Sequence, residues 1–152
     1  MAVIRDLLSY RLHTVANLLS RGAELRYRRE FGVSLWEWRS IALLGGAAGP
    51  LSLNELARSA GIDKSQMSRV MTGLAKRGIV VREVDAEDGR GVQLELSKAG
   101  RKLYTGLIKA AGHRDAAFKN CLSEKERKIF DQALGKLAHQ AREFIQREKT
   151  GK

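Results

Sequence analysis

The residues between Ser65 and Lys76 place hydrogen-bonding and basic side chains at intervals of three and four positions. On a helix this spacing gathers them on one face, made of Ser65, Arg69, Thr72 and Lys76. Hydroxyl, guanidinium and ammonium groups of this kind can bond to the edges of DNA bases and to phosphates. Gln66 and Ser68 flank the polar face, and a glutamine can pair with adenine through two hydrogen bonds. The chemistry that this segment favours is DNA recognition.

The segments on either side of this helix predict how it is held. Its opposite face is apolar and consists of Met67, Val70, Met71 and Leu74. A capped helix, Ser52–Ser59, precedes it across a turn with Gly61, and two strand-like runs, Ile79–Val81 and Val92–Leu96, follow it. Two short helices followed by a β-hairpin form a winged helix-turn-helix. A polar helix face alone is more often a solvated surface, so it is this context that favours DNA recognition.

The loop between the two strands, residues 85–91, carries both acidic and basic side chains. Asp85 or Asp88 can orient Arg90 through a charge-assisted pair, and the Arg90 guanidinium could then enter the narrow minor groove beside the helix. The alternative is a solvated turn, which the glycines of the loop favour. Asp88, Arg90 and the strand residue Arg82 are therefore further candidates for DNA binding.

The remaining helices are predicted from their caps and their apolar spacing. Four starts carry a capping residue with Glu or Gln three positions later, namely Ser34/Glu37, Ser52/Glu55, Asp63/Gln66 and Ser123/Glu126. Outside the helix-turn-helix, we expect helices at Ile4–Glu30, from Ser34 to Gly45–Gly46, from Ser97 to about Asn120 and from Ser123 to about Arg147. The expected fold class is mainly α, with six helices and a β-hairpin wing.

The composition suits a partner that carries negative charge. The 152 residues include 28 Lys and Arg against 17 Asp and Glu, a formal net charge of +11. This surplus favours nucleic acid first and an anionic membrane surface second. The uncharged stretch Ile41–Leu51 is broken by glycines and Pro50, which predicts no membrane span. A single cysteine, Cys121, and an N-terminus without a signal-peptide pattern indicate a cytoplasmic protein.

Taken together, these motifs resemble the MarR-type (multiple antibiotic resistance regulator) transcription factors along nearly the whole chain. The matching segments are Leu35–Arg39 in the second helix, Leu56–Ala57 through Ser65, Ser68–Arg69 to Leu74 and Gly78 in the helix-turn-helix, Asp88–Arg90 with Leu96–Ser97 and Gly100 around the wing, and Leu122–Glu126 before the last helix. Two departures are Gly89, where the family often has Arg, and Ser97, where Thr is usual. The first removes a phosphate contact, and the second keeps a capping hydroxyl.

This resemblance implies a bacterial transcription factor, expected to be a repressor, that binds a pseudo-palindromic operator as a homodimer. Helices from both termini, residues 1–32 and 101–152, would form a dimerisation domain, and residues 33–100 the winged DNA-binding domain. The apolar residues agree, because a near-heptad spacing of this kind buries best against a second chain. These residues are Phe130, Leu134, Leu137, Ala141 and Phe144.

Members of this family commonly release DNA when a small aromatic or anionic ligand binds between the dimerisation helices and the winged domain. The side chains suited to such a ligand here are aromatic or cationic, and comprise His13, Trp36, Trp38, Arg39 and Tyr104. The alternative is structural: Trp38 and Tyr104 would be core residues, and Arg39 a structural or phosphate-contacting residue.

Catalytic and metal chemistry find little support in the sequence. His13, His113 and His139 lack the spacing of metal ligands, and a single cysteine cannot complete a closed zinc site. No glycine-rich phosphate loop and no nucleophile elbow occurs, so we expect no enzyme, no metal and no cofactor. Cys121 lies outside the first helix, where some relatives sense peroxides, and a small apolar role is favoured. The alternative function is a winged helix that binds proteins instead of DNA, which salt-dependent DNA binding would exclude.

Overall fold

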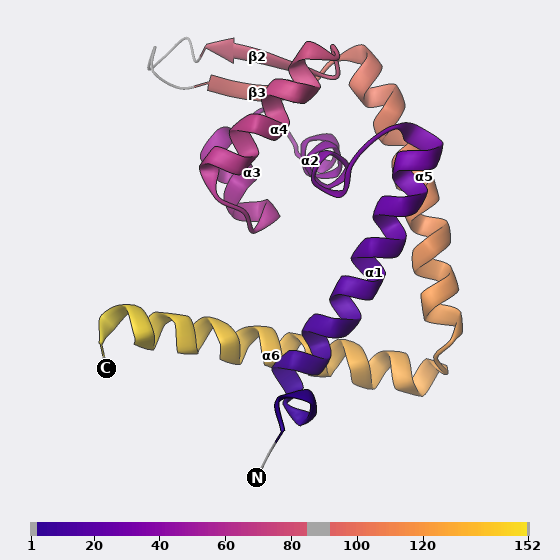
Figure 1. The fold of residues 1–152 in the computed structure, drawn as a ribbon, viewed down its shortest axis with the longest axis vertical. Coiled ribbons are helices and arrows are strands. Elements are labelled where there is room, and N and C mark those ends of the chain that lie inside the picture. Colours follow the sequence, from indigo (N-terminus) through magenta and orange to yellow (C-terminus); the bar gives the residue numbers. More distant parts are fainter. Residues whose placement is uncertain (1–2, 85–91, 152) are drawn as a thin grey trace. The chain divides into compact units, whose positions relative to one another are not determined.

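The computed structural model describes residues 3–84 and 92–151, and it is mainly helical with a small antiparallel sheet (Figure 1). Its helices and strands, in chain order, are η1 Ile4–Asp6, α1 Leu8–Phe31, α2 Leu35–Gly46, β1 Leu51–Ser52, α3 Leu53–Ala60, α4 Lys64–Lys76, β2 Val80–Val84, β3 Val92–Leu96, α5 Lys98–Asn120 and α6 Glu124–Thr150. The predicted class, six helices with a hairpin wing, is confirmed.

The predicted caps begin the helices by local hydrogen bonds. At α2 the Ser34 Oγ accepts from the Glu37 N–H at 3.3 Å, and the Glu37 carboxylate accepts from the Ser34 N–H at 2.7 Å. The same reciprocal bonds start α3 at Ser52 and α6 at Ser123. At α4 the Asp63 carboxylate accepts from the backbone N–H of the residue three positions later at 2.8 Å, which is half of the predicted pair. Each cap satisfies a backbone donor that the helix itself leaves unpaired.

Two helix boundaries and one strand differ from the sequence prediction. The first helix does not run unbroken from Ile4, because Leu7 adopts an extended backbone (φ −67°, ψ 132°) that separates the 3-10 turn η1 from α1. The last helix continues to Thr150 and ends at Gly151 in the left-handed region (φ 65°), whose N–H reaches the Arg147 carbonyl. Strand β1 was not predicted, since two residues carry no periodic signal and the strand exists only through its pairing with β3.

The sheet has the order β1-β3-β2 and turns one face toward the core. Val80 lies opposite Leu96, and Arg82 lies opposite Leu94 in the antiparallel register. Leu94 and Leu96 are buried, as their alternation with polar neighbours predicts, whereas Val92 at the outer end of β3 is exposed. The sheet therefore covers the core at its base and extends outward as the hairpin.

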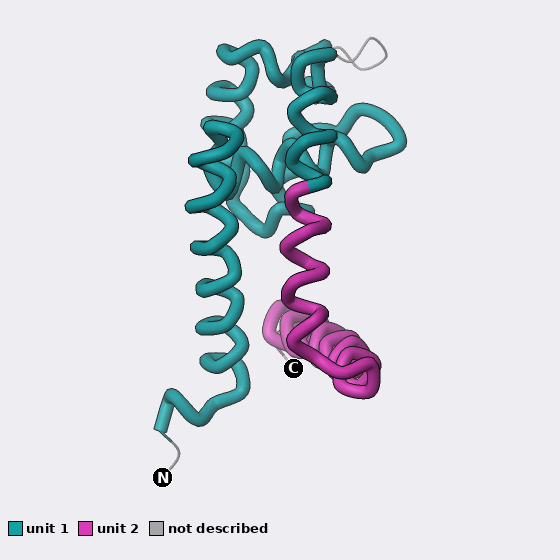
Figure 2. The backbone as a smooth tube through the Cα atoms, turned by 90° about the vertical axis from the view of Figure 1, so that its right-hand side faces the viewer, with its two compact units in different colours: residues 1–109 teal, residues 110–152 magenta. Residues whose placement is uncertain are grey.

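The chain separates into two compact units, residues 1–109 and 110–152, shown in different colours in Figure 2. The first unit holds the core, to which α1, α2, α3, α4, β3 and α5 each contribute. Its largest fully buried side chains are Tyr27, Ile41, Leu56, Met67, Met71, Leu74, Leu94 and Leu107. Helix α4 is thus packed into the same core as α1, because both bury side chains there.

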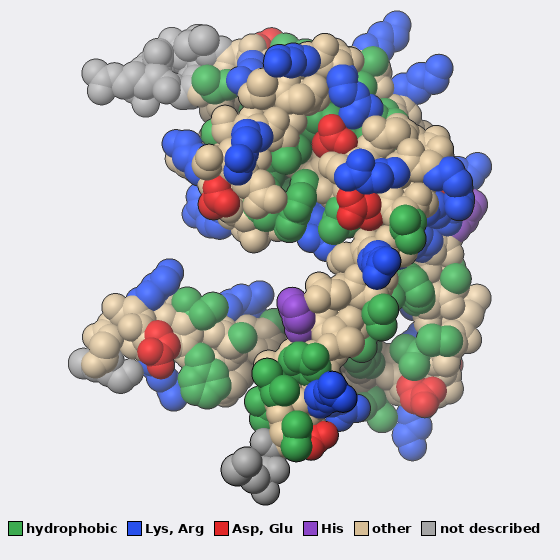
Figure 3. All heavy atoms as spheres, in the orientation of Figure 1, with side chains coloured by type: hydrophobic (Ala, Val, Ile, Leu, Met, Phe, Trp, Pro, Cys, Tyr) green, Lys and Arg blue, Asp and Glu red, His purple; other side chains and the backbone are tan. Residues whose placement is uncertain are grey.

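The second unit contains the end of α5 and all of α6. No side chain of α6 is buried within the described chain, although the helix carries large apolar residues. Those that stay exposed are Ile129, Phe130, Leu134, Phe144 and Ile145, and Figure 3 shows apolar side chains along the visible part of α6. Exposed apolar side chains in such number are typical of an interaction surface.

Gly100 in the first turn of α5 provides a test of how tightly the hairpin base packs. A Cβ at this position would overlap the Ile79 carbonyl oxygen, whereas a Cβ at Gly73 in α4 would meet nothing within 4 Å. We expect Gly100→Ala to lower the free energy of unfolding by about 1–3 kcal/mol through overpacking. The control Gly73→Ala should leave it unchanged or raise it by about 1 kcal/mol, because alanine favours a helix. Urea denaturation at one protein concentration measures both, and equal effects would contradict the packing.

Candidate nucleic-acid interface

Helix α4 presents the predicted polar face to solvent because its other face is buried. Met67, Met71 and Leu74 are each 0% exposed, and Val70 is half-buried. The outward side chains are exposed as the helical spacing predicted, and they are Ser65, Arg69, Thr72 and Lys76. Gln66 and Ser68, at the edges of this face, are half-buried. Helix α4 thus carries hydroxyl and cationic groups along one side, and an α-helix fits the major groove of B-DNA.

The turn before α4 holds the helix at a defined angle to α3. Gly61 takes the left-handed conformation (φ 71°), and its N–H donates to the carbonyls at the end of α3. The N–H of Ile62 also donates to the Ala57 carbonyl at 3.1 Å. Leu56 and Ala57 are buried, so α3 is itself fastened to the core. Together α3 and α4 form the two helices of a helix-turn-helix.

A hydrogen-bonded chain ties the hairpin to the outward face of α4. The Arg82 Nη2 of β2 donates to the Thr72 Oγ1 at 2.8 Å, and this hydroxyl donates to the Ser68 carbonyl at 2.8 Å. Arg82, which the sequence analysis predicted as a DNA contact, links a strand to the helix in this structure. Periodicity offered no signal for this pair, because it joins residues of two different elements.

The wing loop was the other part of the predicted interface. Asp88 and Arg90, the candidates for an oriented arginine in the minor groove, lie outside the described residues. At the base of the hairpin, the Ser97 Oγ donates to the Gly78 carbonyl at 2.6 Å and accepts from the Gly100 N–H at 3.0 Å. Ser97 therefore caps α5, as predicted, and at the same time fastens α5 to the turn that follows α4.

The charges near α4 divide into paired and free groups. Hydrogen bonds from the Ser52 hydroxyl, and then from its backbone, lower the pKa of Glu55, so this carboxylate is engaged in the cap of α3. Within residues 3–84 and 92–151, no carboxylate lies within ion-pair distance of Lys64, Arg69 or Lys76. Figure 3 shows basic side chains more often than acidic ones on the visible face of this unit. The exposed end of the helix-turn-helix is therefore suited to an anionic partner.

The five candidate ligand residues fall into separate environments. The Arg39 guanidinium lies 4.9 Å from the Trp36 ring centroid and donates to the Ser20 Oγ at 3.1 Å. Trp38 packs on the buried Tyr27, with 4.9 Å between ring centroids, which places it against the core. A Cβ added at Gly45 of α2 would lie 2.5 Å from the ring of Tyr104, so this tyrosine covers α2. His13 is exposed on α1, where its Nε2 lies 2.8 Å from the Asn17 Nδ2. Of the five, Trp36 and Arg39 come together.

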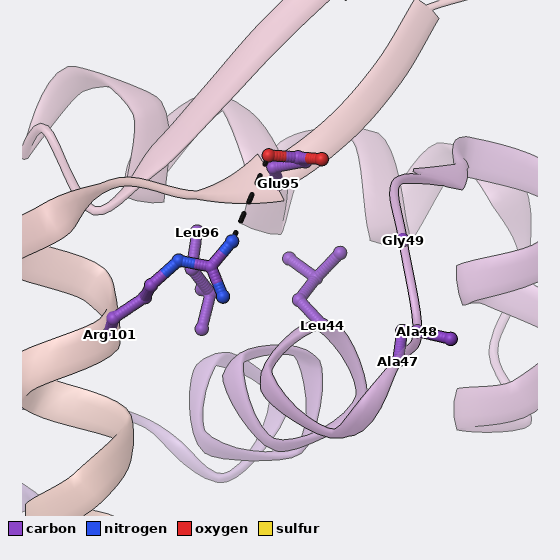
Figure 4. A pocket seen from close by; sticks show the side chains of 7 residues that line it. All are labelled: Leu44, Ala47, Ala48, Gly49, Glu95, Leu96 and Arg101. Carbon is purple, nitrogen blue, oxygen red and sulfur yellow. Dashed lines mark ion pairs between the residues drawn. The ribbon is translucent and has the colours of Figure 1, made fainter.

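A small pocket lies elsewhere in the first unit, and Figure 4 shows the side chains that line it. Its lining consists of Leu44, Ala47, Ala48, Gly49, Glu95, Leu96 and Arg101, and its volume is about 130 Å³. Arg101 points toward Glu95 across its mouth at 3.8 Å (Figure 4). None of the five candidate ligand residues lines this pocket.

Neither a metal-ligand cluster nor a membrane-spanning helix occurs among the described residues. Between residues 3–84 and 92–151, no three His, Cys, Asp or Glu side chains gather as metal ligands would. Cys121 is exposed, and its Sγ donates to the Phe118 carbonyl at 2.9 Å. No helix in this part of the chain is long and apolar enough to cross a membrane.

Comparisons with known proteins agree on one family. The sequence profile of the MarR family matches residues 31–91, which span α2, the helix-turn-helix and the first strand of the hairpin. The chain is 32% identical over 102 residues to the "HTH-type transcriptional regulator FarR" of Neisseria gonorrhoeae, a match that covers 67% of this chain and 69% of FarR. This protein belongs to the MarR family of winged-helix transcriptional regulators. It is accordingly a transcriptional regulator and not an enzyme.

Solved structures share the fold across almost their whole length. The MepR–DNA complex of Staphylococcus aureus matches with a TM-score of 0.81 at 19% identity, over 88% of this chain and 98% of that chain. NadR in complex with 4-hydroxyphenylacetate matches with a TM-score of 0.74 at 25% identity, over 91% of this chain and 96% of that chain. The likeness to MepR at this identity shows a common fold.

The bond between Arg82 and Thr72 predicts an energetic coupling between the hairpin and α4. In a double-mutant cycle, Thr72→Val and Arg82→Ala should show a coupling free energy of about 0.5–1.5 kcal/mol, since each removes one partner of the same hydrogen bond. Thr105→Val is a matched control, because Thr105 also donates to a backbone carbonyl, that of Arg101, and lies on α5. Thr105→Val and Arg82→Ala should be additive in urea denaturation. Additive effects for the Thr72 pair would contradict the link.

Proposed function

We propose that this regulator is a repressor that binds a pseudo-palindromic operator as a homodimer and leaves it when a small aromatic or anionic ligand binds. The observation that carries the proposal is the outward face of α4, on which Arg69 and Lys76 are exposed beside hydroxyl groups. The helix is buried on its other side and held by α3, so it is preorganised for docking. Preorganisation lowers the free-energy cost of ordering these side chains on DNA.

Helix α4 would lie in the major groove and read base edges. Arg69 is the side chain suited to guanine, because its planar guanidinium can donate to two acceptors of that base. Lys64, Lys76 and the hydroxyl of Ser65 would contact phosphates or flanking bases, which sets register without carrying much sequence information. MepR, which has this fold, is known in complex with DNA. A regulator working in this way would be cytoplasmic, where the bacterial chromosome is.

A homodimer is supported by the apolar surface of α6. Five large apolar residues of this helix are exposed, and no residue of α6 is buried within the described chain. Covering them against the same surface of a second copy would remove this apolar area from water and give a two-fold symmetric assembly. Residues 1–32 and 101–152 would form the dimerisation part, and residues 33–100 the DNA-binding part.

The proposed ligand is an aromatic carboxylate. Trp36 and Arg39 place an aromatic ring and a cation within 4.9 Å of each other, and both are half-buried. NadR, a structural relative, is known with 4-hydroxyphenylacetate. That molecule has an aromatic ring and a carboxylate, the two groups that Trp36 and Arg39 would bind. His13, Trp38 and Tyr104 complete the proposed set. Trp38 packs against the core, so its proposed role is to support α2 and thereby the position of Trp36. The ligand must bind more tightly to the DNA-free dimer for it to release the operator.

Replacing Arg69 by Ala tests whether α4 reads bases. On an operator selected from genomic fragments, we expect affinity to fall by about 1–3 kcal/mol, and much less on random duplex, because only the base contact is lost. Arg28→Ala removes an equal charge from a residue paired with Glu24 on α1 and serves as control. Fluorescence anisotropy at matched salt measures both. If Arg69→Ala lowers the affinity for cognate and random DNA equally, Arg69 does not read bases. If the affinity of the wild type for DNA does not change with salt concentration, the protein-binding alternative is favoured.

Operator spacing tests the proposed dimer. Two recognition helices related by a two-fold axis must meet inverted half-sites about one helical turn apart, roughly 10 base pairs between centres. Inserting about five base pairs between the half-sites rotates one of them to the opposite face of the duplex and should abolish binding of the dimer. Inserting about ten base pairs restores the face and should restore part of the affinity. Undiminished affinity for the five-base-pair insertion in a gel-shift assay, or a monomer in sedimentation, would overturn the symmetric dimer.

A further inference from the structure

Arg77, the capping residue that directly follows α4, joins the end of this helix to the corner between α1 and α2. Its Nη1 lies 3.0 Å from the Glu37 Oε1, and its Nη2 donates to the Gly32 carbonyl at 3.2 Å. One planar guanidinium thus bonds to two separate elements that lie more than thirty positions earlier in the chain. Among the described residues, this is the only ion pair that connects α4 or its capping residue to another helix of the first unit.

The Glu37 carboxylate is fixed by a hydrogen bond that does not involve Arg77. One of its oxygens, Oε2, accepts from the Ser34 N–H in the cap of α2, which leaves Oε1 free for Arg77. The Glu37 side chain is 19% exposed, against 41% for Arg77. Because the cap already restricts the Glu37 carboxylate, the glutamate loses little further conformational freedom on pairing, so this pair costs less entropy than an ordinary surface pair.

The second acceptor, the Gly32 carbonyl, belongs to the end of α1. Gly32 takes the left-handed conformation (φ 65°) and its N–H donates to the Arg28 carbonyl at 3.1 Å, which closes the helix. The carbonyls at a helix C-terminus carry partial negative charge, so a guanidinium there is favourable. Val33, the next residue, is fully buried, and its N–H donates to the Tyr27 carbonyl at 3.3 Å. The corner to which Arg77 bonds is therefore fixed to the core by the buried Val33.

We propose that Arg77 is a positioning residue that sets the orientation of α4 relative to α1, and thereby the separation of the two recognition helices in the dimer. The inference rests on the proposed function, in which α1 contributes to the dimerisation part and α4 enters the major groove. A planar guanidinium can donate to the Glu37 carboxylate and the Gly32 carbonyl at the same time, whereas a lysine ammonium at this position would bond well to only one of them. The residue acts on DNA through geometry, without touching it.

A role in stability alone would have a different signature. Loss of stability lowers the active fraction of protein and weakens binding to every operator by the same factor. Loss of positioning changes the preference between operators, because each base pair added or removed between half-sites moves one of them by about 3.4 Å and turns it by roughly 35°. The preference for one spacing over its neighbours is therefore the informative measurement.

The experiment compares wild type with Arg77→Ala, Arg77→Lys and the control Arg28→Ala on three operators whose spacers differ by one base pair. We expect wild type and Arg28→Ala to prefer the selected spacing by about tenfold or more. Arg77→Ala should lose most of that preference, to within about twofold, and Arg77→Lys should lie between them. An unchanged preference in folded Arg77→Ala would overturn the proposal. If Arg77→Ala does not fold, an unchanged preference in Arg77→Lys overturns it instead.

Amide hydrogen exchange of the DNA-free protein tests the link independently of any operator. Arg77→Ala should speed exchange both in the last turn of α4 and at the corner around Val33, whereas Arg28→Ala should affect only the end of α1. Unchanged exchange in α4 would overturn the link. If wild type discriminates no operator at all, the proposed function fails, and the exchange rates still decide whether Arg77 couples the two elements.

Discussion

Burial of one face of α4 is the constraint on which the rest of the structure depends. Met67, Met71 and Leu74 are completely enclosed, and the Ser40 hydroxyl of α2 lies 3.5 Å from the Met67 sulfur. Successive residues of a helix are rotated by about 100°, so burying these three side chains also determines which others face solvent. The orientation of Arg69 and Lys76 follows from apolar packing on the opposite side. A polar substitution inside the buried face would therefore change the orientation of the outward side chains without altering any of them.

The arginines near α4 divide between holding the helix and presenting it. Arg77 bonds to the corner between α1 and α2, and Arg82 bonds from β2 to the Thr72 hydroxyl. These bonds restrain the helix at its end and along its outward face. Arg69, at the middle of the same face, is exposed and pairs with no carboxylate of the described residues. The net charge of +11 therefore counts arginines that bond within the protein together with cations that face solvent, and the sum alone does not separate the two groups.

The two units of the chain obey different physical requirements. The first buries a core drawn from five helices and the sheet, and its own contacts hold α4, the helix proposed to bind DNA. In α6, by contrast, Phe130, Leu134 and Phe144 remain exposed. An amphipathic helix gains most of its stability from packing its apolar face. We therefore expect the exposed apolar side chains of α6 to be covered by another protein surface. Dimerisation and folding of this region would then be one process, and stability would depend on protein concentration.

The sequence by itself determined what local interactions decide. Ser34, Ser52 and Ser123 start helices because cap and return bonds span three residues, and the 3.6-residue period of Met67, Met71 and Leu74 assigns the buried face of α4. The winged fold and the exposed face with Arg69 followed from these signals. Only the tertiary structure decided the pairs between elements, such as Arg77 with Glu37 and Arg82 with Thr72, and the strand β1. Charged side chains far apart in the sequence carry no periodic signal, and their partners depend on where the folded backbone brings them.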